Sequence, residues 1–134
     1  MALTDDQRRF LEERHFSVLG TVNQFGAPHL TVMWYLLDRD EIVFNTKAGR
    51  KKESNLDRDP RVSLLVYDDS GYKYLRIDGK VRIVSDPKIA HADIDRLARR
   101  YHDDPAAAER AIARFNTEER ISYRLPTTRV YDYR

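Results

Sequence analysis

The sequence predicts a mainly β protein of the α+β class, in which about six mostly antiparallel strands curl into a barrel with short flanking helices. Three observations predict this fold. Short segments rich in β-branched and aromatic residues recur along the chain. Tight turns join most neighbouring segments, as between antiparallel strands. The expected order is one helix, three strands, a short helix, two strands, two helices and a last strand.

The opening helix and the first hairpin have clear local signals. Thr4 and Gln7 have the spacing of a capping box, so a short helix begins there. Residues 15–23 alternate in the manner of a strand. Gly26 supplies the positive φ of the following turn. Pro28 can open the next strand because its first position need not donate to the ladder.

The next segments lead to a short basic helix. Residues 29–37 are almost all apolar or aromatic, which predicts a strand covered on both faces. Residues 41–46 predict a third strand. Residues 50–58 predict a short polar helix, which ends before Pro60 because the residue preceding a proline avoids the helical conformation.

The second half of the chain predicts three strands and two helices. The strands are residues 61–68, 72–85 and 121–133. The second of them is expected to kink at Gly79 and the third to bend at Pro126. Both helices begin with an aspartate cap followed by a proline at the first helical position. These two starts are Asp86-Pro87 and Asp104-Pro105.

The composition excludes several classes of protein. The chain has 134 residues, which is room for a single domain spanning 1–134. Lys and Arg total 24 and Asp and Glu total 22, so the net charge is only +2 and does not indicate a nucleic-acid partner. The absence of cysteine excludes disulfides and thiolate sites. No apolar run approaches the roughly 18 residues of a membrane span, and no signal-peptide pattern is present, so we expect a soluble, cytoplasmic protein without a membrane partner.

The histidines do not predict a metal or acid–base site. The four are His15, His29, His91 and His102, and no two have the i, i+4 spacing of a helical metal pair. We interpret them as surface or core residues. Glycine-rich phosphate loops and the nucleophile motif Gly-x-Ser-x-Gly are also missing. The sequence therefore predicts no metal site and no catalytic side chain.

A basic run at the start of a helix is the most informative segment. Arg50, Lys51 and Lys52 open the predicted helix, where free N–H groups already carry partial positive charge and acidic residues are preferred. An anion that meets both the amides and the side chains would make this arrangement favourable. The run therefore predicts a phosphate site. The alternative is a solvated turn whose cations pair with nearby carboxylates such as Glu53 or Asp57.

Large side chains precede the basic run and recur elsewhere. Thr31, Val32, Met33 and Trp34 form either a wall suited to a flat ring or ordinary barrel core. Tyrosine is abundant, with eight residues, and its wide apolar body and polar tip suit an interface or a ligand wall. The tyrosines concerned are Tyr72, Tyr74, Tyr123, Tyr131 and Tyr133.

These residues carry a family resemblance that covers nearly the whole chain. The matching segments are Phe10-Leu11, Val18 to Val22, Gly26 to Leu30, Phe44-Asn45-Thr46, Arg50-Lys51-Lys52, Asn55 to Val62 and the strand of Gly79. Together they resemble the pyridoxamine 5′-phosphate oxidase-like split β-barrel superfamily. The short length, the Lys51-Lys52 doublet and the Leu125-Pro126…Val130-Tyr131 ending are similar to its group that binds the deazaflavin coenzyme F420.

The resemblance implies a homodimer with two cofactor sites at the subunit interface. Arg50 and Lys52, helped by Lys51, would hold the phosphate of the cofactor. The ring and ribityl chain would be lined by the backbone of Thr31, Val32 and Met33 and by Asn45 and Thr46, and Asn55 would also bind the cofactor. Tyr72 and Tyr74 of the partner subunit would close the pocket, and Met33 and Trp34 would shape the pocket of the acceptor.

The function that the resemblance implies is hydride transfer from reduced F420 to an electron-poor organic acceptor such as an enone, a quinone or a tetrapyrrole. An FMN-dependent oxidoreductase on the same barrel is the alternative. A third possibility is a non-catalytic module that stores a flavin, a deazaflavin or haem. The Arg-x-His that grips the substrate of pyridoxamine phosphate oxidases is absent, because Leu125 to Val130 stands in its place.

Overall fold

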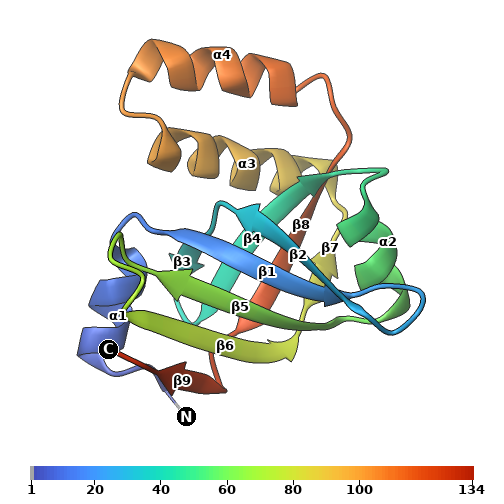
Figure 1. Cartoon of the computed structure of the whole chain (residues 1–134). Helices are drawn as coiled ribbons and strands as arrows, with labels where there is room; N and C mark the ends of the chain where they lie inside the picture. Colours follow the sequence, from blue (N-terminus) through green and yellow to red (C-terminus); the bar gives the residue numbers. More distant parts are fainter. Residues whose placement is uncertain (1) are drawn as a thin grey trace.

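The computed structural model describes residues 2–134 and contains two antiparallel sheets (Figure 1). The first sheet has the strand order β2 (Pro28–Met33), β1 (Phe16–Val22), β5 (Arg61–Tyr67), β6 (Tyr74–Lys80) and β9 (Val130–Asp132). The second has the order β3 (Leu36–Asp38), β4 (Glu41–Lys47), β8 (Arg120–Pro126) and β7 (Arg82–Val84). The inner faces of the two sheets enclose the main core, which confirms the predicted mainly β, α+β fold.

The predicted number of strands is wrong because three predicted strands each divide between the two sheets. Residues 29–37 contribute to β2 and β3, residues 72–85 to β6 and β7, and residues 121–133 to β8 and β9. A chain that passes from one sheet to the other closes the barrel but interrupts the ladder at the crossing. Gly79 lies just before one crossing, where a Cβ atom would stand 3.1 Å from the Leu125 side chain.

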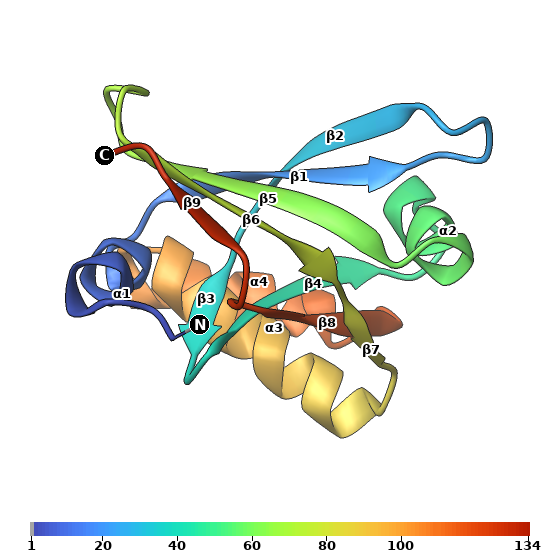
Figure 2. The same cartoon turned by 90° about the horizontal axis from the view of Figure 1, so that it is seen from below.

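Four helices surround the barrel: α1 (Asp5–Glu12), α2 (Lys51–Arg58), α3 (Pro87–Tyr101) and α4 (Pro105–Phe115). The predicted capping box of Thr4 and Gln7 and the predicted caps Asp86 and Asp104 are all present. Figure 2 shows α1 and α2 at opposite ends of the barrel and α3 against the second sheet. Helix α4 packs on α3 and lies farther from the barrel (Figure 1).

Strand β4 of the second sheet is covered on both faces, whereas the first sheet is covered on one. Along β4, Ile42 and Phe44 point into the barrel core, while Val43 joins a second core beneath α3 and α4. The prediction that residues 29–37 are covered on both faces is wrong for β2. Leu30 and Val32 of this edge strand are 67% and 64% exposed.

The outer face of the five-stranded sheet carries the apolar residues that alternate with the core positions. No helix of residues 2–134 lies over this face (Figure 2). Its apolar members are Phe16, Val18, Leu30, Val32, Leu65 and Tyr67. We call these six residues the outer apolar face.

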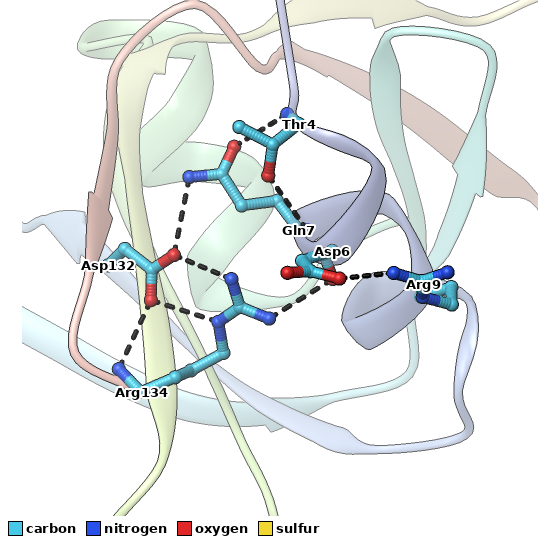
Figure 3. Close-up of polar contacts among 6 residues, drawn as sticks. All are labelled: Thr4, Asp6, Gln7, Arg9, Asp132 and Arg134. Atoms are coloured by element: carbon cyan, nitrogen blue, oxygen red, sulfur yellow. Dashed lines mark hydrogen bonds and ion pairs between the residues drawn. The ribbon is translucent and has the colours of Figure 1, made fainter.

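The two ends of the described chain are joined by polar contacts (Figure 3). The Arg134 guanidinium donates to both carboxylate oxygens of Asp132 at 2.9 and 2.7 Å and to the carbonyl oxygen of Asp6 at 3.1 Å. Gln7 donates to Asp132 as well, at 3.4 Å. Strand β9 is therefore fastened to α1.

None of the helices in residues 2–134 combines the length and the apolar character needed to cross a bilayer.

Candidate functional site

A groove of about 280 Å³ brings most of the predicted site residues together. Strand β2 and the residue after it, β4, α2, α3, α4 and β8 all contribute to its walls. The lining residues are Val32, Met33, Trp34, Asn45, Thr46, Lys47, Arg50, Lys52, Ile94, Leu97, Phe115 and Arg120. One half of the groove is cationic and the other half is apolar.

Four cations and no carboxylate line the groove: Lys47, Arg50, Lys52 and Arg120. Lys52 is only 9% exposed. Burial, followed by the positive charges of Arg50 and Arg120, holds the pKa of Lys52 below the usual value of a lysine. Within residues 2–134, neither Arg50 nor Lys52 has an acidic partner within 4.0 Å. Buried positive charge without a counter-ion is costly, and Lys52 is such a charge, whereas Lys47 and Arg120 both pair with Glu118.

The start of α2 explains how two of these cations reach the groove. Arg50 is the N-cap residue of the helix, and its side chain makes no capping hydrogen bond. Gly49 precedes it at φ 92°, a conformation that glycine adopts without strain. Glu53 accepts a hydrogen bond from the Gly49 amide, so this carboxylate fixes the loop. The predicted alternative, a turn whose cations are neutralised by neighbouring carboxylates, does not fit Arg50 and Lys52.

Arg120 is a groove residue that the sequence prediction missed. It is 8% exposed and lies opposite Lys47 in the β4–β8 ladder. Its Nε donates to Asn45 Oδ1 at 2.9 Å, and its Nη1 donates to Glu118 Oε1 at 3.0 Å. The predicted strand began one residue later, which left Arg120 in a loop. One signal could have identified Arg120. It is a basic residue at the start of the strand that pairs with the strand leading into the basic run.

The apolar half of the groove is an aromatic wall. Trp34 stacks on Tyr101 with ring centroids 5.4 Å apart and meets Phe115 edge-on at 6.2 Å. Met33 is 6% exposed, and Ile94 and Leu97 of α3 complete the wall. A flat ring system therefore finds apolar contact on this side of the cations.

Thr46 adds a polar group to the boundary between the two halves. Thr46 is 3% exposed, and its Oγ1 is buried without a hydrogen-bond partner within residues 2–134. Buried hydroxyl groups are normally hydrogen-bonded, and a missing partner costs free energy. The orphaned hydroxyl and the unpaired cations together fit a phosphorylated ligand with further polar atoms.

Lys51 and Asn55 face a different cavity, on the other side of α2. This second cavity, about 250 Å³, lies between the helix and the β1–β2 hairpin. Asn55 is 4% exposed and donates to Thr21 Oγ1 at 3.1 Å, so it holds the helix on the barrel. The structure therefore does not bring Lys51 and Asn55 into the groove with Arg50 and Lys52.

Thr31, Tyr72 and Tyr74 also lie outside the lining of the groove. Tyr72 is 86% exposed in the turn between β5 and β6. Tyr74 stacks on Tyr133 at 4.6 Å. The expectation that these two tyrosines close the pocket of a partner subunit stays a prediction.

Two of the four histidines make hydrogen-bonding contacts with the backbone, whereas His15 Nε2 and His29 Nδ1 are buried without a hydrogen-bond partner within residues 2–134. His91 Nε2 lies 3.0 Å from the carbonyl oxygen of Glu118, and His102 Nδ1 lies 2.7 Å from that of Ala98. No group of three or more metal-binding side chains forms within residues 2–134.

The fold and the groove define a split-barrel protein with a cationic groove beside an aromatic wall. The sequence matches the family described as pyridoxamine 5′-phosphate oxidase over residues 3–123. This chain belongs to the pyridoxamine 5′-phosphate oxidase family, as the resemblance implied.

Its relatives include proteins named for a deazaflavin cofactor. An F420H(2)-dependent biliverdin reductase of Mycobacterium tuberculosis is 30% identical over 101 residues, which cover 74% of this chain and 72% of that protein. The structure of an F420 reductase is 26% identical, with a TM-score of 0.75 over 96% of this chain and 98% of the other. A conserved hypothetical protein of Mycobacterium tuberculosis is 28% identical, with a TM-score of 0.81 over 99% of this chain and 86% of that one.

Proposed function

We propose that this protein is an F420H2-dependent reductase, which transfers a hydride from the reduced deazaflavin to an electron-poor organic acceptor. The observation that carries the proposal is the pair of unpaired cations, Arg50 and Lys52, at the mouth of an aromatic groove. The relatives named for F420, at 26% and 30% identity, support this cofactor over FMN.

The residues of the groove have distinct roles in this proposal. Arg50 and Lys52 bind the phosphate of the cofactor, and the Thr46 hydroxyl hydrogen-bonds to the polar chain that joins the phosphate to the ring. Met33 and Trp34 contact the ring and the acceptor and exclude water from them. When bound, the deazaflavin supplies the two electrons as hydride, since a carbon replaces the ring nitrogen that makes flavins reactive with oxygen. The acceptor gains the hydride from the cofactor and a proton from solvent, so no side chain of the groove is assigned to the proton transfer.

A tetrapyrrole is the acceptor that we favour among the three classes expected from the sequence. The support is the biliverdin reductase that is 30% identical to this chain, because biliverdin is a linear tetrapyrrole. Its conjugated system is extended and electron-poor, and its pyrrole rings suit a wall built from Trp34 and Phe115. Enones and quinones are the competing classes in the assay below.

We also propose that two copies of the chain pair through the outer apolar face. The face includes Leu30 and Val32, which are 67% and 64% exposed in the single chain. Exposed apolar patches of this kind mark interaction surfaces. Val32 also lines the groove, so pairing here would place the two cofactor sites at the subunit interface. The cytoplasmic location expected from the sequence stays a prediction.

The experiment is a parallel titration of the purified protein with coenzyme F420 and with FMN, followed by fluorescence. We expect tighter binding of F420. Reduced F420 is then mixed with biliverdin, a quinone and an enone, and its oxidation is followed by absorbance. Oxidation with biliverdin supports the full proposal.

Other outcomes of the titration have definite meanings. Tighter binding of FMN would assign the protein to the FMN-dependent alternative. Binding of F420 without turnover of any acceptor would make it the non-catalytic carrier considered above. Binding of neither cofactor would overturn the proposal.

A further inference from the structure

Arg120 is held more firmly than any other cation of the groove. Two of its nitrogens are occupied, Nε by Asn45 and Nη1 by Glu118, at 2.9 and 3.0 Å. Its guanidinium carbon lies 4.8 Å from the centroid of the Phe115 ring. Contacts from three sides leave the side chain little freedom. Its Nη2 makes no hydrogen bond within residues 2–134, so this nitrogen is available to a ligand.

Asn45 has little hydrogen-bonding capacity left for a ligand. Its Nδ2 donates to the Ala90 carbonyl oxygen at 2.9 Å and to Ser122 Oγ at 2.8 Å, and its Oδ1 accepts from Arg120. The residue is 5% exposed. Both donors are therefore used to fix the amide, and the fixed oxygen in turn orients Arg120.

The position of Arg120 relative to the other cations points to a shared anion. Its positive charge acts on Lys52, since it contributes to the lowered pKa of that amine. Burial is the main cause of the lowered pKa of Arg120, and the charge of Arg50 contributes to it as well. An arginine remains charged even so. An anion bound between these three cations would offset their mutual repulsion.

We propose that Arg120 is a third cation of the phosphate site and contacts the phosphate directly, and that Asn45 is a positioning residue that acts through Arg120. This inference rests on the proposed cofactor-binding function. The planar guanidinium suits a phosphate because its nitrogens match the spacing of the oxygens. A prearranged arginine also loses less conformational entropy on binding than a free surface lysine.

The test compares ligands with and without a phosphate. FMN and riboflavin differ only in the phosphate, and F420 is compared with its deazaflavin core, which lacks the phosphate and everything attached beyond it. The variant is Arg120→Gln. Arg114→Gln is the matched control, because Arg114 is exposed and lies over the same Phe115 ring at 5.0 Å but does not line the groove.

We expect Arg120→Gln to weaken binding of the phosphorylated ligands by roughly tenfold to a hundredfold, the effect of losing one charge-assisted contact. Binding of the phosphate-free ligands should change by less than about threefold, within the small effects usual outside such contacts. Arg114→Gln should leave both unchanged. Asn45→Ala should repeat the phosphate-selective loss in weaker form, and a further Arg120→Gln change should then add little.

Three results would overturn the inference. If Arg120→Gln weakened the binding of phosphorylated and phosphate-free ligands equally, Arg120 would support the structure of the groove and not contact the phosphate. A raised KM for the acceptor with unchanged cofactor affinity would mean that it reads the acceptor. If the losses of affinity in Asn45→Ala and Arg120→Gln added fully in the double variant, Asn45 would not act through Arg120.

A second probe keeps this inference distinct from the cofactor proposal. Inorganic phosphate should raise the melting temperature of the wild-type protein and not that of Arg120→Gln. If the protein binds neither F420 nor FMN, the proposed function fails, whereas this phosphate effect still decides the role of Arg120. Equal stabilisation of both proteins by phosphate would overturn that role.

Discussion

The two sides of helix α2 differ sharply although adjacent residues build them. Lys52 is 9% exposed and faces the groove, whereas its neighbour Lys51 is exposed and faces the second cavity. Arg50 is the extended N-cap residue and Lys52 is a buried residue of the first turn, and both line the groove, whereas Lys51 lies on the other side of the helix. The comparison divides the basic run into two cations that line the groove, where we propose anion binding, and one that faces the second cavity.

The largest expected effect comes from removing the cations on the groove side. The double variant Arg50→Ala/Lys52→Ala should weaken the binding of F420 by about a hundredfold or more, since each charge-assisted contact contributes roughly 1.5–3 kcal/mol. Lys51→Ala is the matched control and should change affinity by less than about threefold. Fluorescence titration measures both, and circular dichroism checks that the variants fold. If Lys51→Ala lost as much affinity for F420 as the double variant, the two sides of α2 would not differ in binding.

Local signals predicted most of the fold because they depend on a few neighbouring residues. The box of Thr4 and Gln7 and the turn at Gly26, with its φ of 82°, follow from spacing and residue type alone. The points at which the chain crosses from one sheet to the other could not be predicted from such local signals. Residues 29–37 read as one strand because their composition is continuous, and only the closure of the barrel interrupts them.

The site was predicted in part for a similar reason. Arg50 and Lys52, which line the groove, were predicted because their charge opposes the helix dipole, which is a local conflict. Arg120 was missed since its importance arises from the pairing of β8 with β4, which places it opposite Lys47. Asn55 was assigned to the cofactor by resemblance, but its amide holds α2 against Thr21.

The pKa of Lys52 gives the next prediction. Burial and the neighbouring cations lower this pKa in the free protein, so the amine loses its charge below the ordinary lysine value of 10.5. Affinity for the phosphate should fall as pH rises through the lowered pKa. The Lys52→Arg variant, which stays charged, should bind with a flatter pH profile. Identical profiles for the wild type and Lys52→Arg would show that the charge of Lys52 does not matter for binding.

The same lowered pKa has a consequence for stability. The folded protein disfavours the charged amine relative to the unfolded chain. The penalty is fully present below the lowered pKa, and it is relieved as pH rises from there to 10.5. The wild type should therefore gain stability relative to Lys52→Met over this alkaline range, as measured by urea unfolding. A constant difference between the two proteins would contradict the assignment.

Asn55 on the opposite side of the helix should affect stability and not binding. Asn55→Ala removes the buried hydrogen bond to Thr21 and should lower the free energy of unfolding by about 1–2 kcal/mol. F420 affinity should be retained. Ser54→Ala, an exposed change in the same helix, is the control and should stay within about 0.5 kcal/mol. A selective loss of affinity in Asn55→Ala would return this residue to the binding site.

The smallest expected effect lies at the far end of the barrel from α2, where Arg134 and Asp132 join β9 to α1 (Figure 3). Hydrogen bonds from Arg134, more than any other cause, lower the pKa of Asp132 to about 2. The pair should contribute roughly 0.5–1 kcal/mol, because both side chains are partly exposed. This stabilisation is present above the ordinary aspartate pKa of 3.8 and is lost as pH falls from there towards 2.

Arg134→Ala should remove that contribution near neutral pH and should reduce the loss of stability between about pH 4 and 2, while F420 affinity stays unchanged. Arg129→Ala is the control, because Arg129 is exposed and its side chain makes no ion pair within residues 2–134. Urea unfolding at a series of pH values measures both variants. If Arg134→Ala weakened F420 binding without a loss of stability, the two ends of the barrel would be coupled, and the groove would not be the self-contained site that its contacts indicate.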